Sequence, residues 1–145
     1  MLGHSYEWLC QRIVEDTPDA VIFADREGII RVWNRGAEAM FGYRARETLG
    51  ASLDLIIPEN LRPRHNAGYR RVMAGGATKY GKDTLKVPAL TKDGATISIE
   101  FTLALIRGQS GEILGSAAII RETTARRLEE KELRRRLAAS EGREK

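Results

Sequence analysis

The sequence is poor in cysteine, and Cys10 is the only one among its 145 residues. A lone cysteine excludes an intramolecular disulfide and a metal site built from clustered cysteines. Long apolar runs are missing too, since no stretch approaches the roughly 18 apolar residues of a membrane span. The first ten residues lack the basic start and the small-residue cleavage site of a signal peptide. These absences predict a cytoplasmic protein that has no membrane partner.

Motifs that carry enzyme chemistry are also absent. The sequence contains neither a Gly-rich phosphate-binding loop nor the G-x-G-x-x-G dinucleotide fingerprint. Its two histidines, His4 and His65, stand far apart in the chain and give no nucleophile–base pair with Cys10. No paired carboxylates stand out. We therefore expect no catalytic residues and no enzymatic activity.

The formal net charge of +4 is concentrated at the C-terminal end. Residues 121–145 contain nine basic and six acidic side chains, so this tail carries most of the excess. Basic and acidic side chains alternate along this tail, as on a solvated helix with i,i+4 ion pairs. A nucleic-acid-binding arm would instead contain mainly basic side chains. The pattern indicates a charged helix and argues against a nucleic-acid partner.

Short segments rich in β-forming residues alternate with turns. AVIFAD (20–25) and IIRVWN (29–34) flank a turn that contains Gly28, which predicts a β-hairpin. Residues 85–94 and 95–108 meet at Asp93-Gly94, a strong hairpin signal, and 113–122 form a last strand. In the 95–108 segment apolar and polar residues alternate, which is typical of a strand with one buried face.

Helical patterns fill the remaining segments. A short amphipathic helix precedes Asp16, another helix follows Asn34 and stops at Gly42, and a longer one runs from 59 to about 74. Beyond Thr123-Thr124 the chain is helical and charged. The order predicts an α+β domain with helices on one face of an antiparallel sheet. We expect an N-terminal helix at 1–15, a sensory domain at 16–122 and a C-terminal signalling helix at 123–145.

This order of elements, and the turn and helix-end residues that separate them, resemble the PAS family over roughly residues 12 to 125. The matching positions are the Asp25…Gly28 turn, Asn34, the Phe41-Gly42-Tyr43 stop, Ile57-Pro58 before the long helix, the Asp93-Gly94 hairpin and Arg121-Glu122-Thr123-Thr124. The resemblance implies a five-stranded antiparallel sheet of order 2-1-5-4-3 that cups a ligand cavity against the helices. It also implies a sensory role with a downstream output domain or partner protein.

Within this family, IPENLRPRHNAGYRRVMA (57–74) looks most like the haem-binding oxygen sensors, namely the rhizobial oxygen-sensing histidine kinases and the enteric oxygen-sensor phosphodiesterase. The resemblance implies that His65 is the axial ligand of a haem b iron, which would sense a diatomic gas or redox change. Read from the residues alone, Leu61, His65, Gly68 and Val72 form one helical stripe, with Tyr69 beside it. The alternative is a histidine that bonds to a backbone carbonyl.

The resemblance also implies the rest of the cofactor site. Arg71 and Lys79 lie six and fourteen residues beyond His65, the offsets at which the relatives bind the haem propionates. Both remain open to the reading that they are solvated surface charges. The other haem face would be lined by Leu85, Ile99, Phe101, Leu103 and Ala118. Leu85 stands where the oxygen-sensing relatives have an arginine that donates to bound oxygen.

A second reading remains open. The domain could be a PAS interaction module without haem, with an organic ligand or none. A light-sensing flavin domain is excluded because its reactive cysteine lies near the middle of the domain, whereas Cys10 precedes the first strand. On either reading we expect a homodimer through the terminal helices. The C-terminal helix has an imperfect apolar seam formed by Ala125, Leu128, Leu133, Leu137 and Ala138, and a second apolar face is formed by Trp8, Leu9 and Ile13.

Overall fold

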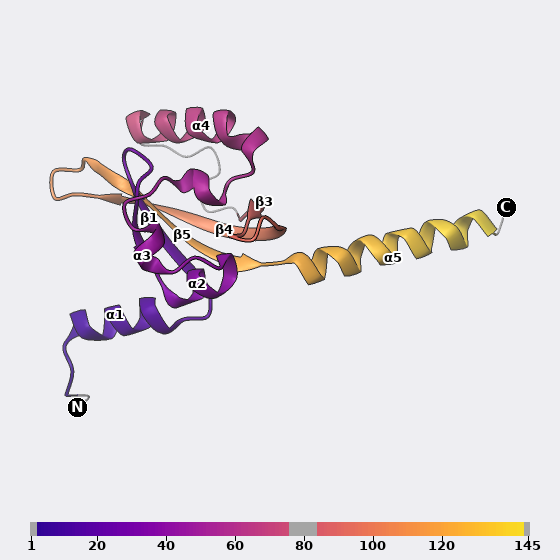
Figure 1. The fold of residues 1–145 in the computed structure, drawn as a ribbon, viewed down its shortest axis with the longest axis horizontal. Coiled ribbons are helices and arrows are strands. Elements are labelled where there is room, and N and C mark those ends of the chain that lie inside the picture. The colour runs from indigo at the N-terminus through magenta and orange to yellow at the C-terminus, as the bar shows by residue number, and fades with distance from the viewer. Residues whose placement is uncertain (1–2, 76–83, 144–145) are drawn as a thin grey trace.

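A computed structural model describes residues 3–75 and 84–143 as one antiparallel sheet with flanking helices (Figure 1). The strand order is β2-β1-β5-β4-β3, which confirms the predicted sheet. The strands are β1 (Ala20–Asp25), β2 (Ile30–Trp33), β3 (Leu85–Leu90), β4 (Thr96–Arg107) and β5 (Ile113–Glu122). The helices are α1 (Tyr6–Asp16), α2 (Arg35–Phe41), α3 (Ala45–Thr48), α4 (Arg62–Gly75) and α5 (Thr124–Arg143), with 3-10 turns η1 (Leu53–Ile56) and η2 (Glu59–Leu61).

The two expected hairpins form where the turn residues predict them. In the β1–β2 turn the Asp25 carboxylate accepts hydrogen bonds from the backbone N–H groups of Glu27 (3.0 Å) and Ile29 (3.1 Å). Gly28 follows with φ 77°, a left-handed conformation that glycine adopts without a steric cost. The β3–β4 turn uses Gly94 with φ 88° in the same way. Residues within each turn therefore determine where the two hairpins form.

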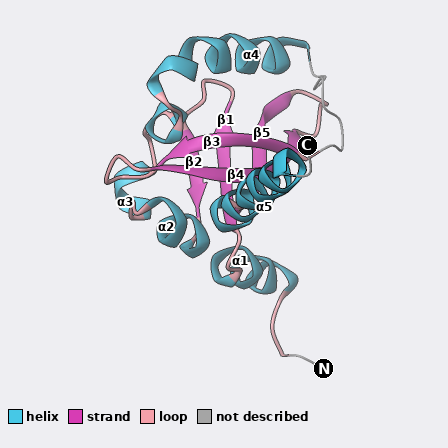
Figure 2. Ribbon diagram, turned by 90° about the vertical axis from the view of Figure 1, so that its right-hand side faces the viewer, coloured by secondary structure: helices cyan, strands magenta, loops and turns pink. Residues whose placement is uncertain are grey.

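The hydrophobic core lies between one face of the sheet and the helices that follow β2. Figure 2 shows α2 and α3 beside the sheet and α4 at its other end. Phe41 of α2 is fully buried and packs against the Trp33 ring at a centroid distance of 5.5 Å. The core cluster combines α2 and η1 with all five strands and consists of Ala20, Ile22, Ile30, Trp33, Ala37, Phe41, Ile56, Ala89, Ile99 and Ile120. This arrangement confirms the α+β class.

Asn34 joins α1, β1 and α2 next to this core. The sequence pattern placed it at the end of the second strand, but β2 ends at Trp33 and Asn34 is the N-cap of α2. Its fully buried Oδ1 accepts from the backbone N–H groups of Val21 (2.8 Å) and Ala37 (2.9 Å). Its Nδ2 donates to the carbonyls of Val14 (2.7 Å) and Asp19 (3.0 Å). One amide therefore ties α1, β1 and α2 together.

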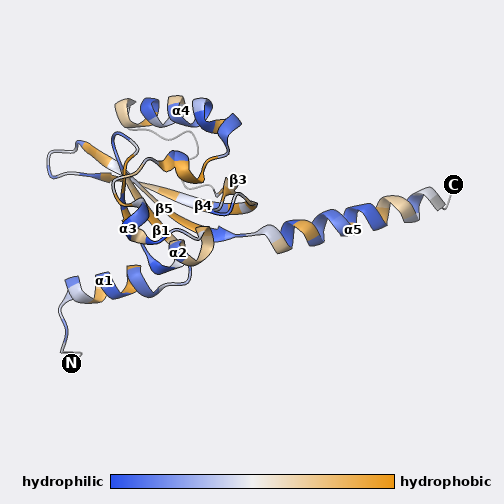
Figure 3. Cartoon of the chain, in the orientation of Figure 1, coloured by the Kyte–Doolittle hydropathy of each residue, from blue (hydrophilic) through white to orange (hydrophobic). Residues whose placement is uncertain are grey.

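The charged helix α5 projects away from the domain, as Figures 1 and 3 show. Its start is held by Ser98 of β4, whose carbonyl accepts from the Thr123 N–H (2.7 Å) and whose N–H donates to the Thr124 hydroxyl (3.0 Å). Arg126 adds an ion pair with Glu100 at 2.6 Å. No helix within 3–75 and 84–143 is long and apolar enough to cross a membrane.

Replacing Asn34 by alanine should destabilise the domain by about 3–5 kcal/mol, because buried backbone donors and acceptors lose their partners. Urea unfolding followed by circular dichroism measures this change. The matched control is Asn60→Ala, at an exposed amide in η2, which should stay within about 0.5 kcal/mol of the parent. Equal stability of the two variants would contradict the role given to Asn34.

Candidate functional site

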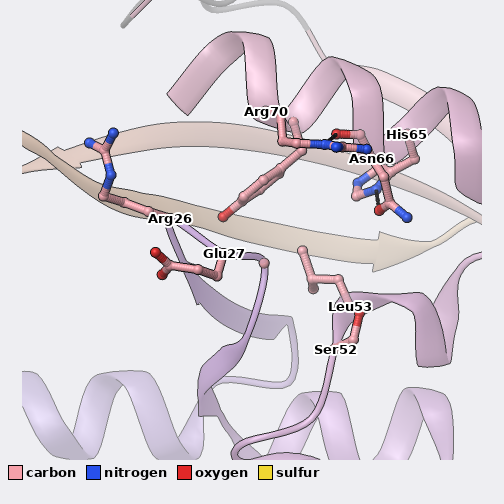
Figure 4. A pocket seen from close by; sticks show the side chains of 9 residues that line it. Arg26, Glu27, Ser52, Leu53, His65, Asn66 and Arg70 are labelled. Atoms are coloured by element: carbon pink, nitrogen blue, oxygen red, sulfur yellow. Dashed lines mark hydrogen bonds between the residues drawn. The ribbon is translucent and has the colours of Figure 1, made fainter. Parts of the chain in front are cut away.

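A pocket of about 420 Å³ lies between α4, the β1–β2 turn and the segment that enters η1 (Figure 4). Its volume is within the range of small-molecule sites in proteins. Three stretches of sequence that are far apart in the chain supply its walls. The lining residues are Arg26, Glu27, Gly28, Ser52, Leu53, His65, Asn66, Tyr69 and Arg70.

The helix α4 presents His65 to this pocket. Pro63 in its first turn is compatible with a helix start, and Arg62 donates to the Ile57 carbonyl at 3.0 Å, which fixes that end. The half-buried His65 ring lies with its Nδ1 3.3 Å from the Asn66 Oδ1. Its ring also stacks near Tyr69, with centroids 6.0 Å apart. Figure 4 shows the imidazole above Leu53, on the pocket side of the helix.

Tyr69 connects α4 to the sheet. Its hydroxyl donates to the carbonyls of Asp25 (2.6 Å) and Ala24 (3.0 Å), and it accepts from the Ser116 hydroxyl at 3.4 Å. Ala24 and Ser116 are direct partners across β1 and β5. Burial raises the pKa of the Tyr69 phenol, and the negative charge of Asp25 raises it further, although the Ser116 hydrogen bond acts in the opposite direction. The neutral phenol is therefore the form that the folded protein prefers.

This anchor determines which face of α4 meets the pocket. The lining positions 65, 66, 69 and 70 are spaced one helical turn apart and form one stripe. The stripe predicted from the sequence shares His65 and Tyr69 with the stripe that lines the pocket. The other members of the predicted stripe are Leu61, Gly68 and Val72. These three residues do not line the pocket.

Positive charge dominates α4. The helix carries Arg62, Arg64, Arg70 and Arg71, and its sequence RPRHNAGYRRVMAG contains no acidic residue. Across the pocket Arg26 donates to the Ile113 carbonyl at 2.9 Å, which holds its side chain against the sheet. Glu27 is the only acid among the lining residues.

The other predicted cofactor residues lie on the sheet or outside the pocket. Leu85 opposes Phe101, Phe101 opposes Ile120, and Leu103 opposes Ala118 in the strand register, while Ile99 is buried in the core. Arg71 is exposed on α4 beside Gly68, and Lys79 lies outside the described residues. These assignments stay predictions. Arg26, Ser52, Leu53, Asn66 and Arg70 carried no sequence signal that would have placed them beside His65.

The described residues offer no group of three or more histidine, cysteine, aspartate or glutamate side chains that could hold a bare metal ion.

Tyr69→Phe should lower the free energy of unfolding by about 1–2 kcal/mol at neutral pH, because the phenol hydrogen bonds disappear. Since folding raises the phenol pKa, its contribution is complete below the unfolded pKa near 10 and is lost as pH rises through the folded value. Parallel denaturation at neutral and alkaline pH measures both effects, with Tyr43→Phe as the control. A pH dependence identical in the parent and Tyr69→Phe would contradict this account.

Known proteins share this sequence pattern. A family description of the PAS fold matches residues 14–128. The oxygen sensor protein DosP of Escherichia coli (strain K12) is 25% identical over 120 residues, which cover 83% of this chain and 15% of DosP. The sensor protein FixL of Bradyrhizobium diazoefficiens is 36% identical over 55 residues, covering 38% of this chain and 11% of FixL. The chain corresponds to a small part of each sensor.

A solved structure shares the fold. The PAS domain of a protein from Colwellia psychrerythraea superimposes with a TM-score of 0.72 at 22% identity, covering 83% of this chain and 99% of that domain. At this identity the likeness concerns the fold alone. Together with the match over residues 14–128, it shows that the chain belongs to the PAS fold family, and the likeness to DosP and FixL makes it a sensory signalling module.

Proposed function

We propose that this domain binds haem b through His65 and senses a diatomic gas or a change of redox state. The observation that carries the proposal is the position of His65, half buried at the wall of a pocket and next to Asn66. Two relatives are consistent with it, since DosP is named an oxygen sensor protein and FixL a sensor protein. When bound, haem supplies an iron centre that can bind a gas or change its oxidation state.

The residues around His65 suit such a group. If the His65 Nδ1 carries the proton, it donates to the Asn66 Oδ1 and leaves Nε2 as the basic nitrogen that a metal requires. Leu53 offers an apolar contact in the same pocket. The guanidinium groups of Arg26 and Arg70 supply positive charge for the acidic substituents of a porphyrin.

A change at α4 has a direct way to reach the output helix. Tyr69 on α4 contacts Ser116 on β5, and β5 leads through Thr123 into α5. We assign residues 1–15 to an N-terminal helix, 16–122 to the sensing domain and 123–145 to the signalling helix. The signalling helix would act on an output domain or a partner protein.

A second function is favoured by the same pocket. Its arginines and polar side chains suit a small organic ligand without iron, bound by a PAS module that works through protein contacts. Haem binding distinguishes the two functions, because only the first predicts a Soret band and one iron per chain.

His65→Ala should abolish or sharply weaken haem binding and leave the fold intact, because the iron–imidazole bond is the specific anchor. Haemin titration followed by the Soret band measures binding, and circular dichroism checks the fold. His4→Ala is the matched control, since His4 is exposed in the N-terminal segment and stacks on Trp8. An unchanged Soret spectrum in His65→Ala would exclude His65 as the ligand.

The domain should also form a homodimer through its terminal helices. Leu128, Leu133 and Leu137 are about 60% exposed on α5, and their apolar surface is large for a helix that is otherwise charged. On α1, Trp8 and Ile13 are 44% and 68% exposed. An isolated helix of this kind is marginal in water, so pairing with a second copy would bury the seam.

Sedimentation should therefore report a dimer that dissociates in Leu133→Glu, because a charge in the seam opposes pairing. Arg134→Glu is the control: it introduces the same side chain one residue further on, pointing about 100° away around the helix. A monomeric parent, or equal weakening by both substitutions, would count against pairing through α5.

A further inference from the structure

We propose that the face of the sheet that points away from the core packs against the same face of a second copy, with corresponding strands of the two copies running in the same direction. The inference adds a second interface and an orientation to the helix pairing proposed above, and it does not depend on haem. This surface, called the outer face, consists of Val21, Phe23, Thr102, Ala104, Ala117 and Ile119.

Strand alternation places these side chains on one side of the sheet. On β1 the core residues Ala20 and Ile22 alternate with Val21 and Phe23, so the last two point to the opposite side. The register joins each of them to its partner on β5 and, through β5, to β4. The outer face therefore consists of two adjacent rows that cross three strands.

The outer face is largely apolar and exposed. Ile119 is 43% exposed, and Ile106, one row further along β4, is 39% exposed. Thr102 and Ala104 are exposed as well. A stable interface buries about 800 Å² on each partner, and the three exposed leucines of α5 supply only part of that area. The outer face would supply more of it, because contact with a second apolar surface removes these side chains from water.

A row of alternating charges borders the outer face at the end of the sheet from which α5 leaves. Arg121 forms an ion pair with Asp19 at 3.2 Å and lies opposite Glu100 on its other side. Glu100 in turn lies opposite Lys86. A hydrogen bond from Arg126 lowers the pKa of Glu100, and the two neighbouring positive charges of the row lower it further. From the start of β1 through β5 and β4 to β3, the charges are therefore negative, positive, negative and positive.

Charge complementarity selects the orientation of the second copy. Two equal sheets that meet face to face share a two-fold axis that lies between them. If the axis runs along the strands, the row faces itself in reversed order, so Asp19 meets Lys86 of the second copy and Arg121 meets its Glu100. If the axis runs across the strands, the row faces either its own like charges or the other end of the sheet, where Ile106 is exposed. Only the first arrangement pairs all four charges while the apolar rows still meet each other.

The same orientation suits α5. With the axis along the strands, β5 runs in the same direction in both copies, and the two α5 helices leave from one end of the dimer, where Figure 1 shows α5 projecting beyond β5. Arg126 and Arg127 bind the side chains of Glu100 and Ser98, which alternate along β4 with the core residue Ile99. The first turn of α5 therefore begins on the side of the sheet that carries the outer face.

Sedimentation of the full chain tests the surface. Ile119→Glu should weaken the dimer roughly tenfold or more, because carboxylates would be buried against apolar rows without partners. Val87→Glu is the matched control, since Val87 is 39% exposed but lies opposite the core residue Ile99 and therefore on the other face of the sheet. It should change the dissociation constant by less than about threefold. Circular dichroism checks that both variants fold.

A charge exchange between Asp19 and Lys86 tests the orientation. The strands at these two positions are separated by two others, so within one copy the side chains are roughly 14 Å apart in the sheet. Asp19→Lys should weaken the dimer about fivefold or more, because the new lysine faces Lys86 of the second copy. Adding Lys86→Asp should recover most of the loss. This second change cannot restore the ion pair of Asp19 with Arg121, so the recovery would come from the second copy.

The outcomes separate this interface from the pairing of α5. If Ile119→Glu and Val87→Glu dimerise alike, the outer face is overturned, even where Leu133→Glu dissociates the dimer. If Ile119→Glu dissociates the dimer and Leu133→Glu does not, the outer face stands and the pairing of α5 falls. If the charge exchange recovers nothing, the orientation is overturned. A folded parent that is monomeric at tens of micromolar overturns both interfaces.

Discussion

The domain depends on one buried amide. Asn34 uses both ends of its side chain to satisfy backbone groups of α1, β1 and α2, and of Asp19 just before β1. Such groups would be costly to bury without partners, so the amide allows three segments to meet in a dry space. The core around Trp33 and Phe41 is assembled beside this amide, and the β1–β2 turn at the far end of β1 lines the pocket.

A second polar link, at Tyr69, has a different role. It attaches α4 to the sheet through two backbone carbonyls and one serine, whereas the body of the domain is joined by apolar packing. Hydrogen bonds of this kind are directional, so they fix the rotation of the helix as well as its distance from the strands. A ligand that touches His65 or Asn66 therefore acts on a helix whose position is sensitive to a single hydroxyl group.

The features that could be predicted from the sequence depend on residues that are close together in the chain. The hairpins at Gly28 and Gly94 and the helix stop at Gly42 follow from residues that adopt a left-handed conformation, and all three form as expected. The role of Asn34 was not predictable, because its partners lie up to 20 residues away. Which of Arg70 and Arg71 lines the pocket was not predictable either, since neighbours on a helix differ by about 100° and the contact of Tyr69 with the sheet helps to fix the rotation.

Ser98 gives the first turn of α5 a fixed direction. The N–H, the carbonyl and the hydroxyl of this one strand residue bind Thr124, Thr123 and Arg127 respectively. Because each residue of an α-helix turns by about 100°, the angular phase of the whole rod is set at its base. Inserting one residue between β5 and α5 would rotate the exposed leucines by that angle, whereas inserting seven would nearly restore their phase. The number of residues between β5 and α5 therefore decides in which direction the exposed leucines of α5 point relative to the sheet.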